Sequence, residues 1–371
     1  MVMPLCEYFG KCGGCNLQHI DYSNQIENKK KALFNITKFD NINVFSDKEY
    51  FYRNRMDMIF NHNGIGFRKK GTWSEFLDIN KCVISNEKLN ILINEIRAFF
   101  NDVDYFDLKK QSGTFRYVVI RTPNKSSSLS FVLNSDSTNI SEAIEKIKEF
   151  SNISSAENIA VTYVKHNSDM SISDDFFMVK GSEFLREDYL GKSFLFSIQG
   201  FFQNNSVMAE KMHFYVNSKL KEYITKDFDL LDLYGGVGTF GIINSDLFNK
   251  VTIVESVKSC IDAANINIKN NNILNAEAIT LDAINLKKLK LSNKLFVITD
   301  PPRSGMHPKT ILQLKILKPQ VIIYISCNIQ QLGKDLAKFK YYKIKSAALF
   351  DLFPQTNHCE AVIELVRNED L

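Results

Sequence analysis

Apolar and polar residues follow a regular rhythm in the second half of the chain. From about residue 200, short runs of β-branched and aromatic residues alternate with segments whose apolar residues recur at helical spacing. The pattern predicts strands at Phe228–Tyr234, Lys250–Glu255, Ala276–Thr280, Lys294–Asp300, Val321–Cys327, Tyr342–Asp351 and Ala361–Arg367. It predicts helices at Ser206–Thr225, Gly238–Ser245, Lys258–Asn271, Pro308–Leu317 and Ile329–Phe339. Such alternation favours a doubly wound, parallel α/β sheet.

The last two predicted strands need a different connection. Only residues 352–360 separate them, which is too short for a crossover helix, so we expect an antiparallel hairpin at the end of the sheet. A parallel sheet closed by an antiparallel pair is the outline of the class I methyltransferase fold. At the start of this half, Ser206 is the expected N-cap of a helix. The apolar face of that helix is expected to carry Val207, Tyr215, Leu220 and Ile224.

The first half of the chain lacks this rhythm. Strand-like runs occur at Arg55–Asn61, Tyr117–Thr122, Leu129–Asn134 and Asn158–Lys165, and a helical pattern at Ser141–Ser151. We interpret this half as a mixed α+β domain. A chain of 371 residues exceeds the roughly 250–300 residues that one core serves, so we predict two domains, 1–195 and 196–371.

Composition is that of an ordinary globular protein, with 44% apolar and 12% aromatic residues. A net charge of +4 permits a nucleic-acid partner without requiring one. No charged start leads into an apolar stretch, and no run approaches the ~18 apolar residues of a membrane span, so we expect a cytoplasmic protein. In that compartment, the seven cysteines indicate metal binding or catalysis rather than disulfides. The Asn-rich stretch Asn265–Asn275 is interpreted as compositional bias without a function.

A glycine-rich loop follows the first strand of the second half. Gly236, Gly238 and Gly241 match G-x-G-x-x-G between a strand and a helix, a spacing that lets the backbone approach a nucleotide-like cofactor. The motif alone is weak and fits a nicotinamide enzyme equally well. Glu255, at the end of the next strand, is placed for ribose hydroxyls, and Asp282, after the third strand, for an adenine amino group. The alternative is that both are solvated loop acids.

Three chemically active groups are expected at strand ends in the same half: Asp300, Cys327 and Glu360. A thiol beside two carboxylates suits pyrimidine C5 methylation, because thiolate addition to C6 makes C5 nucleophilic enough to take a methyl group. A base must then remove the C5 proton, and Glu360 is the candidate. Asp300, held by the turn at Pro301 and Pro302, would hydrogen-bond the base edge.

Neighbouring residues have weaker predicted roles. Arg303 is expected to orient the loop or hold a phosphate. For His358 a positioning or surface role is favoured over catalysis, and Cys260 is interpreted as a core residue.

Four cysteines in the first half suggest a metal centre. Cys6, Cys12 and Cys15 have the spacing C-x5-C-x2-C among glycines, with Cys82 as a distant fourth. Four thiolates suit either a [4Fe–4S] cluster or a structural zinc ion, and the spacing does not distinguish them.

Basic and aromatic residues are interleaved between Tyr50 and Trp73. Cations that contact phosphates and rings that stack on unpaired bases make a single-strand RNA surface plausible, although a solvated face over an ordinary core fits equally well. The RNA-binding candidates are Arg53, Arg55, Arg68, Lys69 and Lys70, with Arg116 and Arg121 as weaker ones.

Taken together, these motifs resemble the iron–sulfur family of RNA 5-methyluridine methyltransferases over nearly the whole chain. The matching segments are CEYFGKCGGC (Cys6–Cys15), YRNR (Tyr52–Arg55), Cys82, GFFQNN (Gly200–Asn205), DLYGGVGTFG (Asp232–Gly241), Glu255, Asp282, DPPRSGM (Asp300–Met306), SCN (Ser326–Asn328) and DLFPQTNHCE (Asp351–Glu360). The resemblance implies a [4Fe–4S] cluster on Cys6, Cys12, Cys15 and Cys82. It implies Cys327 as nucleophile, Glu360 as base, and S-adenosylmethionine contacts from Gln203, Tyr234, Glu255, Asp282 and Asp300.

Two departures from the family pattern matter. Gly235 stands where the family usually has a cysteine, and we expect no loss of chemistry because the position belongs to a backbone turn. The cluster motif starts at Cys6, which leaves no room for the N-terminal TRAM barrel of longer members. The chain therefore resembles the short branch that methylates 23S ribosomal RNA, while archaeal short members act on tRNA.

Other classes fit fewer of these features. RNA cytosine-C5 methyltransferases resemble one another in a second cysteine where this chain has Asp300–Arg303. A nicotinamide-dependent oxidoreductase explains only the glycine loop. A non-catalytic, RNA-binding iron–sulfur protein leaves the strand-end residues unexplained. The sequence thus predicts an RNA uracil-C5 methyltransferase with rRNA as the favoured substrate and tRNA as the alternative.

Overall fold

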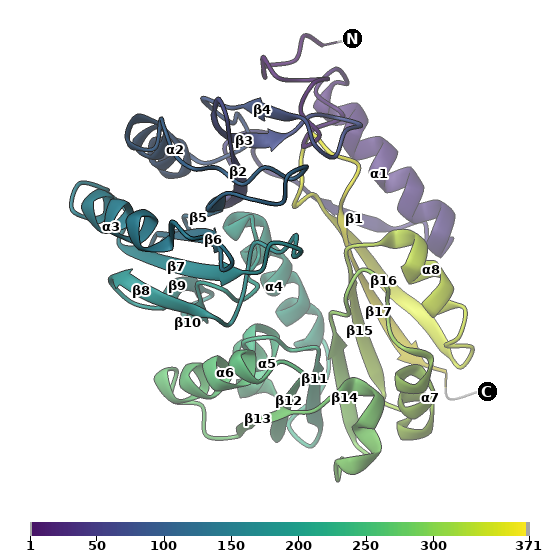
Figure 1. Cartoon of the computed structure of the whole chain (residues 1–371). Coiled ribbons are helices and arrows are strands. Elements are labelled where there is room, and N and C mark those ends of the chain that lie inside the picture. Colours follow the sequence, from purple (N-terminus) through teal and green to yellow (C-terminus); the bar gives the residue numbers. More distant parts are fainter. Residues whose placement is uncertain (1, 369–371) are drawn as a thin grey trace. The chain divides into compact units, whose positions relative to one another are not determined.

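The chain forms two structural units that do not follow the sequence order (Figure 1). The computed structural model describes residues 2–368. The first unit comprises Met1–Tyr22, Lys48–Glu187 and Ser197–Ser206, and the second comprises Ser23–Asp47, Asp188–Phe196 and Val207–Leu371. A single boundary near residue 195 therefore misses Ser23–Asp47, which joins the second unit because strand β1 (Ile42–Phe45) pairs with β16 (Tyr342–Phe350).

An eight-stranded sheet forms the centre of the second unit, in the order β1-β16-β17-β15-β14-β11-β12-β13. The strands not yet located are β11 (Asp229–Leu233), β12 (Lys250–Glu255), β13 (Ala276–Thr280), β14 (Leu295–Thr299), β15 (Val321–Ser326) and β17 (Glu360–Arg367). All pairings are parallel except those of β17, which runs antiparallel to both β15 and β16. The predicted hairpin is confirmed, and every strand predicted here is present to within one residue at each end.

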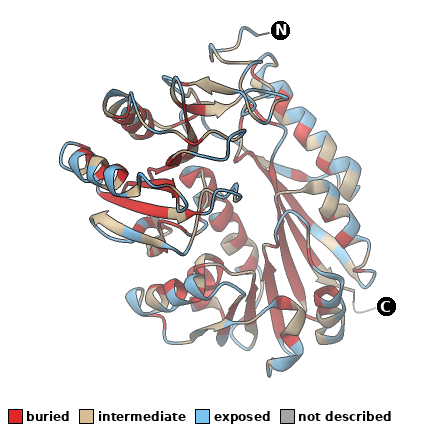
Figure 2. Ribbon diagram, in the orientation of Figure 1, coloured by how far each residue is buried: buried red, intermediate tan, exposed pale blue. Residues whose placement is uncertain are grey.

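Helices cover both faces of this sheet. Leucines and isoleucines of three helices share one apolar core with the sheet: α1 (Tyr22–Thr37), α7 (Pro308–Leu317) and α8 (Ile329–Leu336). The opposite face carries α4 (Ser206–Leu220), α5 (Thr239–Asn244) and α6 (Lys258–Asn270) (Figure 1). Two short 3-10 helices complete the unit, η1 (Ser245–Leu247) and η2 (Ala283–Lys288). Figure 2 shows the central strands buried along their length.

The helix predicted at Ser206–Thr225 ends five residues early, at Leu220. Tyr215 and Leu220 are buried as predicted, but Val207 is 46% exposed and Ile224 is 89% exposed. The predicted apolar face is therefore wrong at both ends. Its C-terminal error follows from the early end of the helix, which places Ile224 outside it.

The first unit contains a seven-stranded sheet in the order β4-β3-β2-β5-β6-β7-β8. Its strands are β2 (Arg55–Asn61), β3 (Gly64–Arg68), β4 (Phe76–Asp78), β5 (Phe115–Arg121), β6 (Ser128–Asn134), β7 (Asn158–Val164) and β8 (Phe176–Lys180). One face packs on helices α2 (Glu87–Phe99) and α3 (Ile140–Ser151) through a large apolar core. The second face mixes polar residues, such as Asp57, Arg121 and Ser130, with a small apolar cluster of Tyr117, Val119, Val132 and Val164. A separate two-stranded pair is formed by β9 (Phe184–Tyr189) and β10 (Lys192–Ser197).

Within residues 2–368, no helix is long and apolar enough to span a membrane.

Candidate active site

The glycine loop leaves β11 in a conformation that few side chains adopt. Tyr234, Gly236 and Gly238 have φ values of 60°, 53° and 86°. The loop is fixed by the buried Asp232, whose Oδ2 accepts a hydrogen bond of 2.7 Å from the backbone N–H of Gly241. Burial, together with the charges of Asp300 and Glu255, raises the pKa of Asp232 to about 7, although the hydrogen bond from Gly241 opposes the increase.

Asn267 of α6 holds the same loop from outside. Its amide Nδ2 donates to the carbonyl of Val237 (3.1 Å) and to that of Leu195 (3.0 Å), while its Oδ1 accepts from the Leu195 N–H (2.7 Å). One helix turn later, Asn271 makes the same pair of bonds to Ser193. Side chains at the C-terminal end of α6 thus hydrogen-bond the backbone of strand β10. The Asn-rich stretch that we interpreted as compositional bias therefore has a structural role.

Carboxylates converge at this edge of the sheet. Glu255 ends β12, and its Oε1 accepts three hydrogen bonds from its own loop, from the N–H and Oγ of Ser256 and the N–H of Val257. Asp282 caps η2 through one oxygen, which accepts from Ile284 N at 3.0 Å. In each residue the second carboxylate oxygen makes no hydrogen bond within the described chain. Together with Asp232 and Asp300, these groups make a negative edge suited to a cationic ligand with hydroxyl and amino donors.

Asp300 begins a tight loop that a neighbouring carboxylate supports. Oδ2 of the fully buried Asp335 accepts hydrogen bonds from Met306 N (2.9 Å) and from the Tyr324 hydroxyl (2.8 Å). Gly305 has a φ of 76°, and a Cβ there would lie 2.5 Å from the same Oδ2. The loop from Asp300 to Met306 is therefore tied to β15, the strand that leads to Cys327.

Cys327 and Glu360 lie at the ends of adjacent antiparallel strands, β15 and β17. The thiol is half-buried. Burial, with smaller contributions from the charges of Glu360 and Asp300, raises the pKa of Cys327 to about 11, and Arg303 opposes the increase. These shifts mean that the three predicted catalytic groups lie within electrostatic reach of one another.

Glu360 is 5% exposed, and its Oε2 has no hydrogen-bond partner among the described residues. Burial and the nearby Asp300 raise its pKa well above the usual value for a glutamate. Burial also raises the pKa of Asp300 to about 7. A carboxylate with raised proton affinity and an unpartnered oxygen is suited to accept a proton from a substrate.

Arg303, His358 and Asn328 complete the surface of the site. An Arg303 Nη2 lies 3.0 Å from Nδ1 of His358, and Asn328 donates to the Arg303 carbonyl (3.0 Å). Asn328 also caps α8 by accepting from Gln331 N. His358 thus contacts the arginine of the loop.

The segment before Glu360 is anchored by helix α1, which the sequence analysis did not predict. Lys29 makes a buried ion pair with Asp351 (2.6 Å), and Gln25 exchanges hydrogen bonds with Gln355. Gln25, Lys29 and Leu33 are the buried residues of this helix. Their i, i+4, i+8 spacing is a helical signal, but two of them are polar, so an apolar pattern does not reveal it.

The model of the tRNA (uracil-5-)-methyltransferase family matches residues 21–368. The chain belongs to this family. It is 32% identical over 368 residues to the tRNA (uracil(54)-C(5))-methyltransferase of Pyrococcus abyssi, covering 98% of this chain and 86% of that relative. It is also 32% identical over 364 residues to an uncharacterized RNA methyltransferase of Nanoarchaeum equitans, covering 96% and 79%.

The crystal structure of the Pyrococcus abyssi enzyme in complex with S-adenosyl-L-homocysteine matches with a TM-score of 0.80 at 30% identity, covering 96% of this chain and 86% of that one. The protein is thus an S-adenosylmethionine-dependent RNA (uracil-5-)-methyltransferase. The predicted methyltransferase fold and reaction class are confirmed.

The four cysteines of this methyltransferase lie near one another in the first unit. Burial raises the pKa values of Cys6, Cys12 and Cys15, and the charge of Cys82 adds to the increase in each of them. Cys12 Sγ also accepts a hydrogen bond from Gly14 N (3.4 Å). In residues 2–368, however, no group of three or more His, Cys, Asp or Glu side chains is arranged to hold a metal ion.

The predicted RNA-binding residues also belong to the first unit, but they are not equally available. Arg55 pairs with Asp57 (2.8 Å), Arg53 Nε donates to the Arg55 carbonyl, and Lys69 pairs with Glu75. Arg121, ranked lower from sequence, is 3% exposed, and its Nε and Nη2 have no hydrogen-bond partner among the described residues. Burial lowers its pKa to about 9.

Gln203, predicted to contact the methyl donor, lies in the first unit, in the segment Ser197–Ser206. Its carbonyl accepts a hydrogen bond from Asn54 Nδ2 at 3.2 Å. Asn54 Nδ2 also donates to Ser206 Oγ (2.9 Å). The YRNR and GFFQNN motifs are therefore joined through Asn54.

Proposed function

We propose that the protein forms 5-methyluridine at position 54 of tRNA. The observation that supports this substrate is the 32% identity, over nearly the full chain, with a relative named for uracil 54 of tRNA. The 23S ribosomal RNA substrate favoured from sequence has no such support among these relatives. The tRNA alternative therefore becomes the favoured hypothesis.

Cys327 is the proposed nucleophile. Its thiolate adds to C6 of the uracil, which moves the C5=C6 electron pair to C5 and the adjacent carbonyl. In the free protein, burial and two carboxylates favour the neutral thiol, since both raise its pKa. Arg303 opposes this effect, so its side chain supports the thiolate form.

Asp300 is proposed to position the uracil. A carboxyl group with a pKa of about 7 can accept a hydrogen bond from uracil N3–H when ionised or donate one to O4 when protonated. The loop held by Asp335 fixes this group relative to the strand that carries Cys327.

S-adenosylmethionine supplies the methyl group and leaves as S-adenosylhomocysteine. The proposed binding residues are Gln203, Tyr234, Gly236, Gly238, Glu255, Asp282 and Asp300. The free oxygens of Glu255 and Asp282 and the negative edge around Asp232 support this assignment, because the donor carries hydroxyl and amino donors and positive charge.

Glu360 is the proposed base of the last step. Its carboxylate removes the C5 proton, the C5–H electron pair re-forms C5=C6, and the bond between C6 and Sγ breaks to release the thiolate. The unpartnered Oε2 and the raised pKa of Glu360 support this role.

A [4Fe–4S] cluster on Cys6, Cys12, Cys15 and Cys82 also remains a proposal. The donor set supports such a cluster, because Cys82, Cys12 and Cys6 all lie close enough to Cys15 to add to the increase in its pKa that burial causes. We propose that it would hold the N-terminal segment and Cys82 together, with no part in the methylation chemistry.

The substrate is tested by incubating the full-length protein with S-adenosylmethionine and either unmodified tRNA or unmodified 23S rRNA. Nuclease digestion and mass spectrometry then locate the methylated nucleoside. We expect 5-methyluridine at position 54 of tRNA, with Cys327→Ala as the inactive control. Modification of the rRNA alone would restore the earlier hypothesis, and 5-methylcytidine would exclude both.

A further inference from the structure

Residues 351–359 connect β16 to β17 without forming a helix or a strand, yet most of this loop is buried. Phe350 and Glu360, at its two ends, are cross-strand partners. In a buried loop, the backbone groups need hydrogen-bond partners that regular secondary structure would otherwise supply. The conformation of the loop, and with it the position of Glu360, therefore depends on those partners.

Helix α1 supplies two of these partners from its side chains. Lys29 Nζ donates to the Phe353 carbonyl at 3.3 Å as well as to Asp351 Oδ1 at 2.6 Å. One turn earlier, Gln25 Oε1 accepts from the Gln355 N–H at 3.1 Å, and Gln25 Nε2 donates to Gln355 Oε1 at 3.0 Å. Two successive turns of one helix thus hold three residues of the loop.

The backbone of Gln355 shows how strongly the loop is constrained. Its φ is 67°, in the left-handed region that is unfavourable for residues other than glycine. Such a conformation persists only where the surrounding structure holds it. The two hydrogen bonds with Gln25 provide that support.

Thr356 extends these contacts towards the base. Its Oγ1 donates to the Phe353 carbonyl at 2.8 Å, the same carbonyl that accepts from Lys29. The same oxygen accepts from the His358 N–H at 3.2 Å. A continuous set of hydrogen bonds therefore leads from Lys29 to a residue two positions before Glu360.

Helix α1 also contacts the element that follows the nucleophile. Helix α8 begins directly after Cys327, with Asn328 as its N-cap. A Cβ on Gly333 of α8 would lie 2.8 Å from Cγ2 of Ile36, so the backbone of α8 approaches α1 closely. One helix therefore supports both the loop that leads to Glu360 and the helix that follows Cys327.

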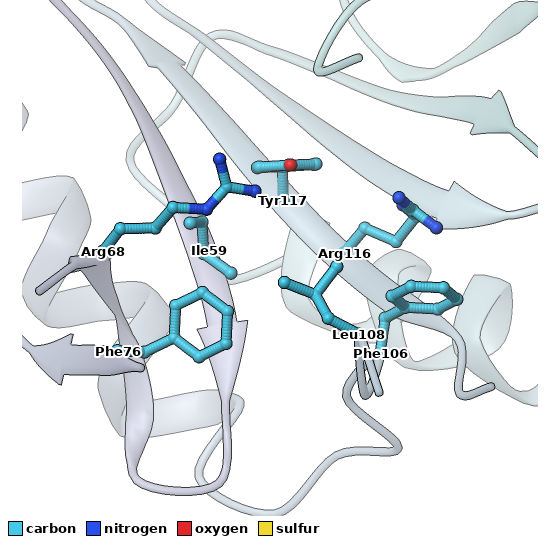
Figure 3. A pocket seen from close by; sticks show the side chains of 7 residues that line it. All are labelled: Ile59, Arg68, Phe76, Phe106, Leu108, Arg116 and Tyr117. Atoms are coloured by element: carbon cyan, nitrogen blue, oxygen red, sulfur yellow. The ribbon is translucent and has the colours of Figure 1, made fainter. Parts of the chain in front are cut away.

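The ion pair at the centre of these contacts is deeply buried. The side chains of Lys29 and Asp351 are 5% and 0% exposed. Figure 3 shows Arg68 of the first unit, whose ion pair with Asp169 is 37% and 60% exposed. An apolar pair in place of a buried ion pair is often equally or more stable, so stability alone gives little reason for Lys29 and Asp351. Their burial favours a role in fixing one conformation of the loop.

We propose that Lys29 is a positioning residue for proton abstraction and holds Glu360, through the loop, where it can take the C5 proton. The inference rests on the proposed function, because it takes Glu360 as the base. Without Lys29, Cys327 still adds to C6 and the methyl group is still transferred to C5. Transfer of the C5 proton to the Glu360 carboxylate is slow, so the C5–H electron pair does not re-form C5=C6 and the bond between C6 and Sγ persists.

Lys29→Met should separate the two steps in a single-turnover reaction with tRNA whose uridines carry tritium at C5. Methyl transfer from labelled S-adenosylmethionine should stay within about twofold of the wild-type rate, whereas tritium release should slow about 10- to 100-fold, as for a misplaced catalytic group. A methylated covalent complex between Cys327 and RNA should therefore accumulate on denaturing gels.

Three further variants sharpen the comparison. Lys29→Arg keeps the positive charge and should restore most of the tritium release. Lys31→Met makes the same substitution in an exposed ion pair with Glu27 on the same helix and should leave both rates unchanged. Because Lys29→Met leaves Asp351 buried without this cation, Gln25→Met provides an uncharged second test and should slow tritium release selectively. Thermal unfolding checks that each variant is folded.

Two results would overturn the inference. If Lys29→Met and Gln25→Met slow methyl transfer and tritium release equally, α1 stabilises the fold without positioning the base. If neither rate changes, the contacts of α1 have no effect on the reaction.

Glu360→Gln is the reference that separates this inference from the proposed function. If Glu360→Gln accumulates the covalent complex and the folded α1 variants do not, the positioning role of Lys29 fails while the proposed base stands. If none of them accumulates it although the wild type forms 5-methyluridine, the assignment of Glu360 as base fails, and the positioning role fails with it.

Discussion

Ile253 lies against Gly235 so closely that a Cβ on this glycine would come within 2.6 Å of its Cγ2 atom. The same fully buried side chain would meet a Cβ on Gly238 at 3.0 Å and one on Gly241 at 2.8 Å. One isoleucine of β12 therefore requires three glycines in the cofactor loop. It also gives a packing reason for Gly235 at the position where the family usually has a cysteine.

Gly235→Ala should lower the free energy of unfolding by about 1–3 kcal/mol, the usual range for overpacking a core. Ile253→Ala alone should cost about 2–5 kcal/mol through its cavity. The double variant should be more stable than the sum predicts, since the new methyl group fills part of that cavity. Denaturant unfolding of the wild type, the two single variants and the double variant measures this coupling energy. If the two changes in unfolding free energy simply added, the contact between Gly235 and Ile253 would be contradicted.

Gly305→Ala should disturb the loop that carries Asp300 and Arg303. The methyl group would meet Oδ2 of Asp335, and the positive φ adds backbone strain, so we expect a loss of about 2–4 kcal/mol of stability and reduced methylation. Gly71 has a similar φ of 78° but nothing within 4 Å of its Cβ position. Gly71→Ala is therefore the matched control for strain alone. If Gly305→Ala and Gly71→Ala lost the same amount of stability and of activity, a role for the Asp335 contact would be excluded.

The thiol of Cys327 should react slowly at neutral pH. Because burial and two carboxylates raise its pKa to about 11, its rate of alkylation by iodoacetamide should keep rising above the ordinary cysteine pKa of about 8.5. Glu360→Gln removes one negative charge, so the pKa should fall and alkylation should reach its plateau at lower pH. Glu255→Gln, at another strand end, should leave the profile unchanged. Peptide mass spectrometry separates Cys327 from the other cysteines.

Regular alternation made the second unit predictable. Each of the strands β11 to β17 could be predicted from its own apolar run. Two of these runs end in the catalytic candidates Asp300 and Cys327. Helix α1 was missed because Gln25 and Lys29, which it buries, are polar. Strand β1 was missed because four residues carry little pattern, so the boundary between the units was predicted too simply.

Contacts between residues that are distant along the chain could not be predicted from the sequence either. Nothing local marks Asp335 as the support of the Asp300 loop or Asn267 as the support of the glycine loop. Both are short polar residues inside helices. Each stabilises its loop by hydrogen-bonding backbone groups of segments that are distant in the sequence. Asn267 was also missed because it lies in an Asn-rich stretch that we interpreted as compositional bias.

Asn267→Ala should therefore lower stability and cofactor affinity together. It removes three hydrogen bonds from the backbone of Leu195 and Val237, at a cost of about 2–3 kcal/mol. Asn270→Ala, on the exposed side of the same helix, should change stability by less than about 0.5 kcal/mol. Calorimetric titration with S-adenosylhomocysteine measures the affinity. Equal behaviour of the two variants would show that Asn267 does not hold the loop.

The central claim, that Cys327 attacks uracil and Glu360 releases the product, is tested most directly by trapping the intermediate. Glu360→Gln protein, incubated with unmodified tRNA and S-adenosylmethionine, should accumulate a covalent complex that survives denaturing electrophoresis. Combined protease and nuclease digestion should then link Cys327 to a methylated uridine at position 54, and Cys327→Ala should abolish the complex. A complex through another cysteine would contradict Cys327 as the nucleophile, and rapid turnover without any complex would remove Glu360 from the role of base.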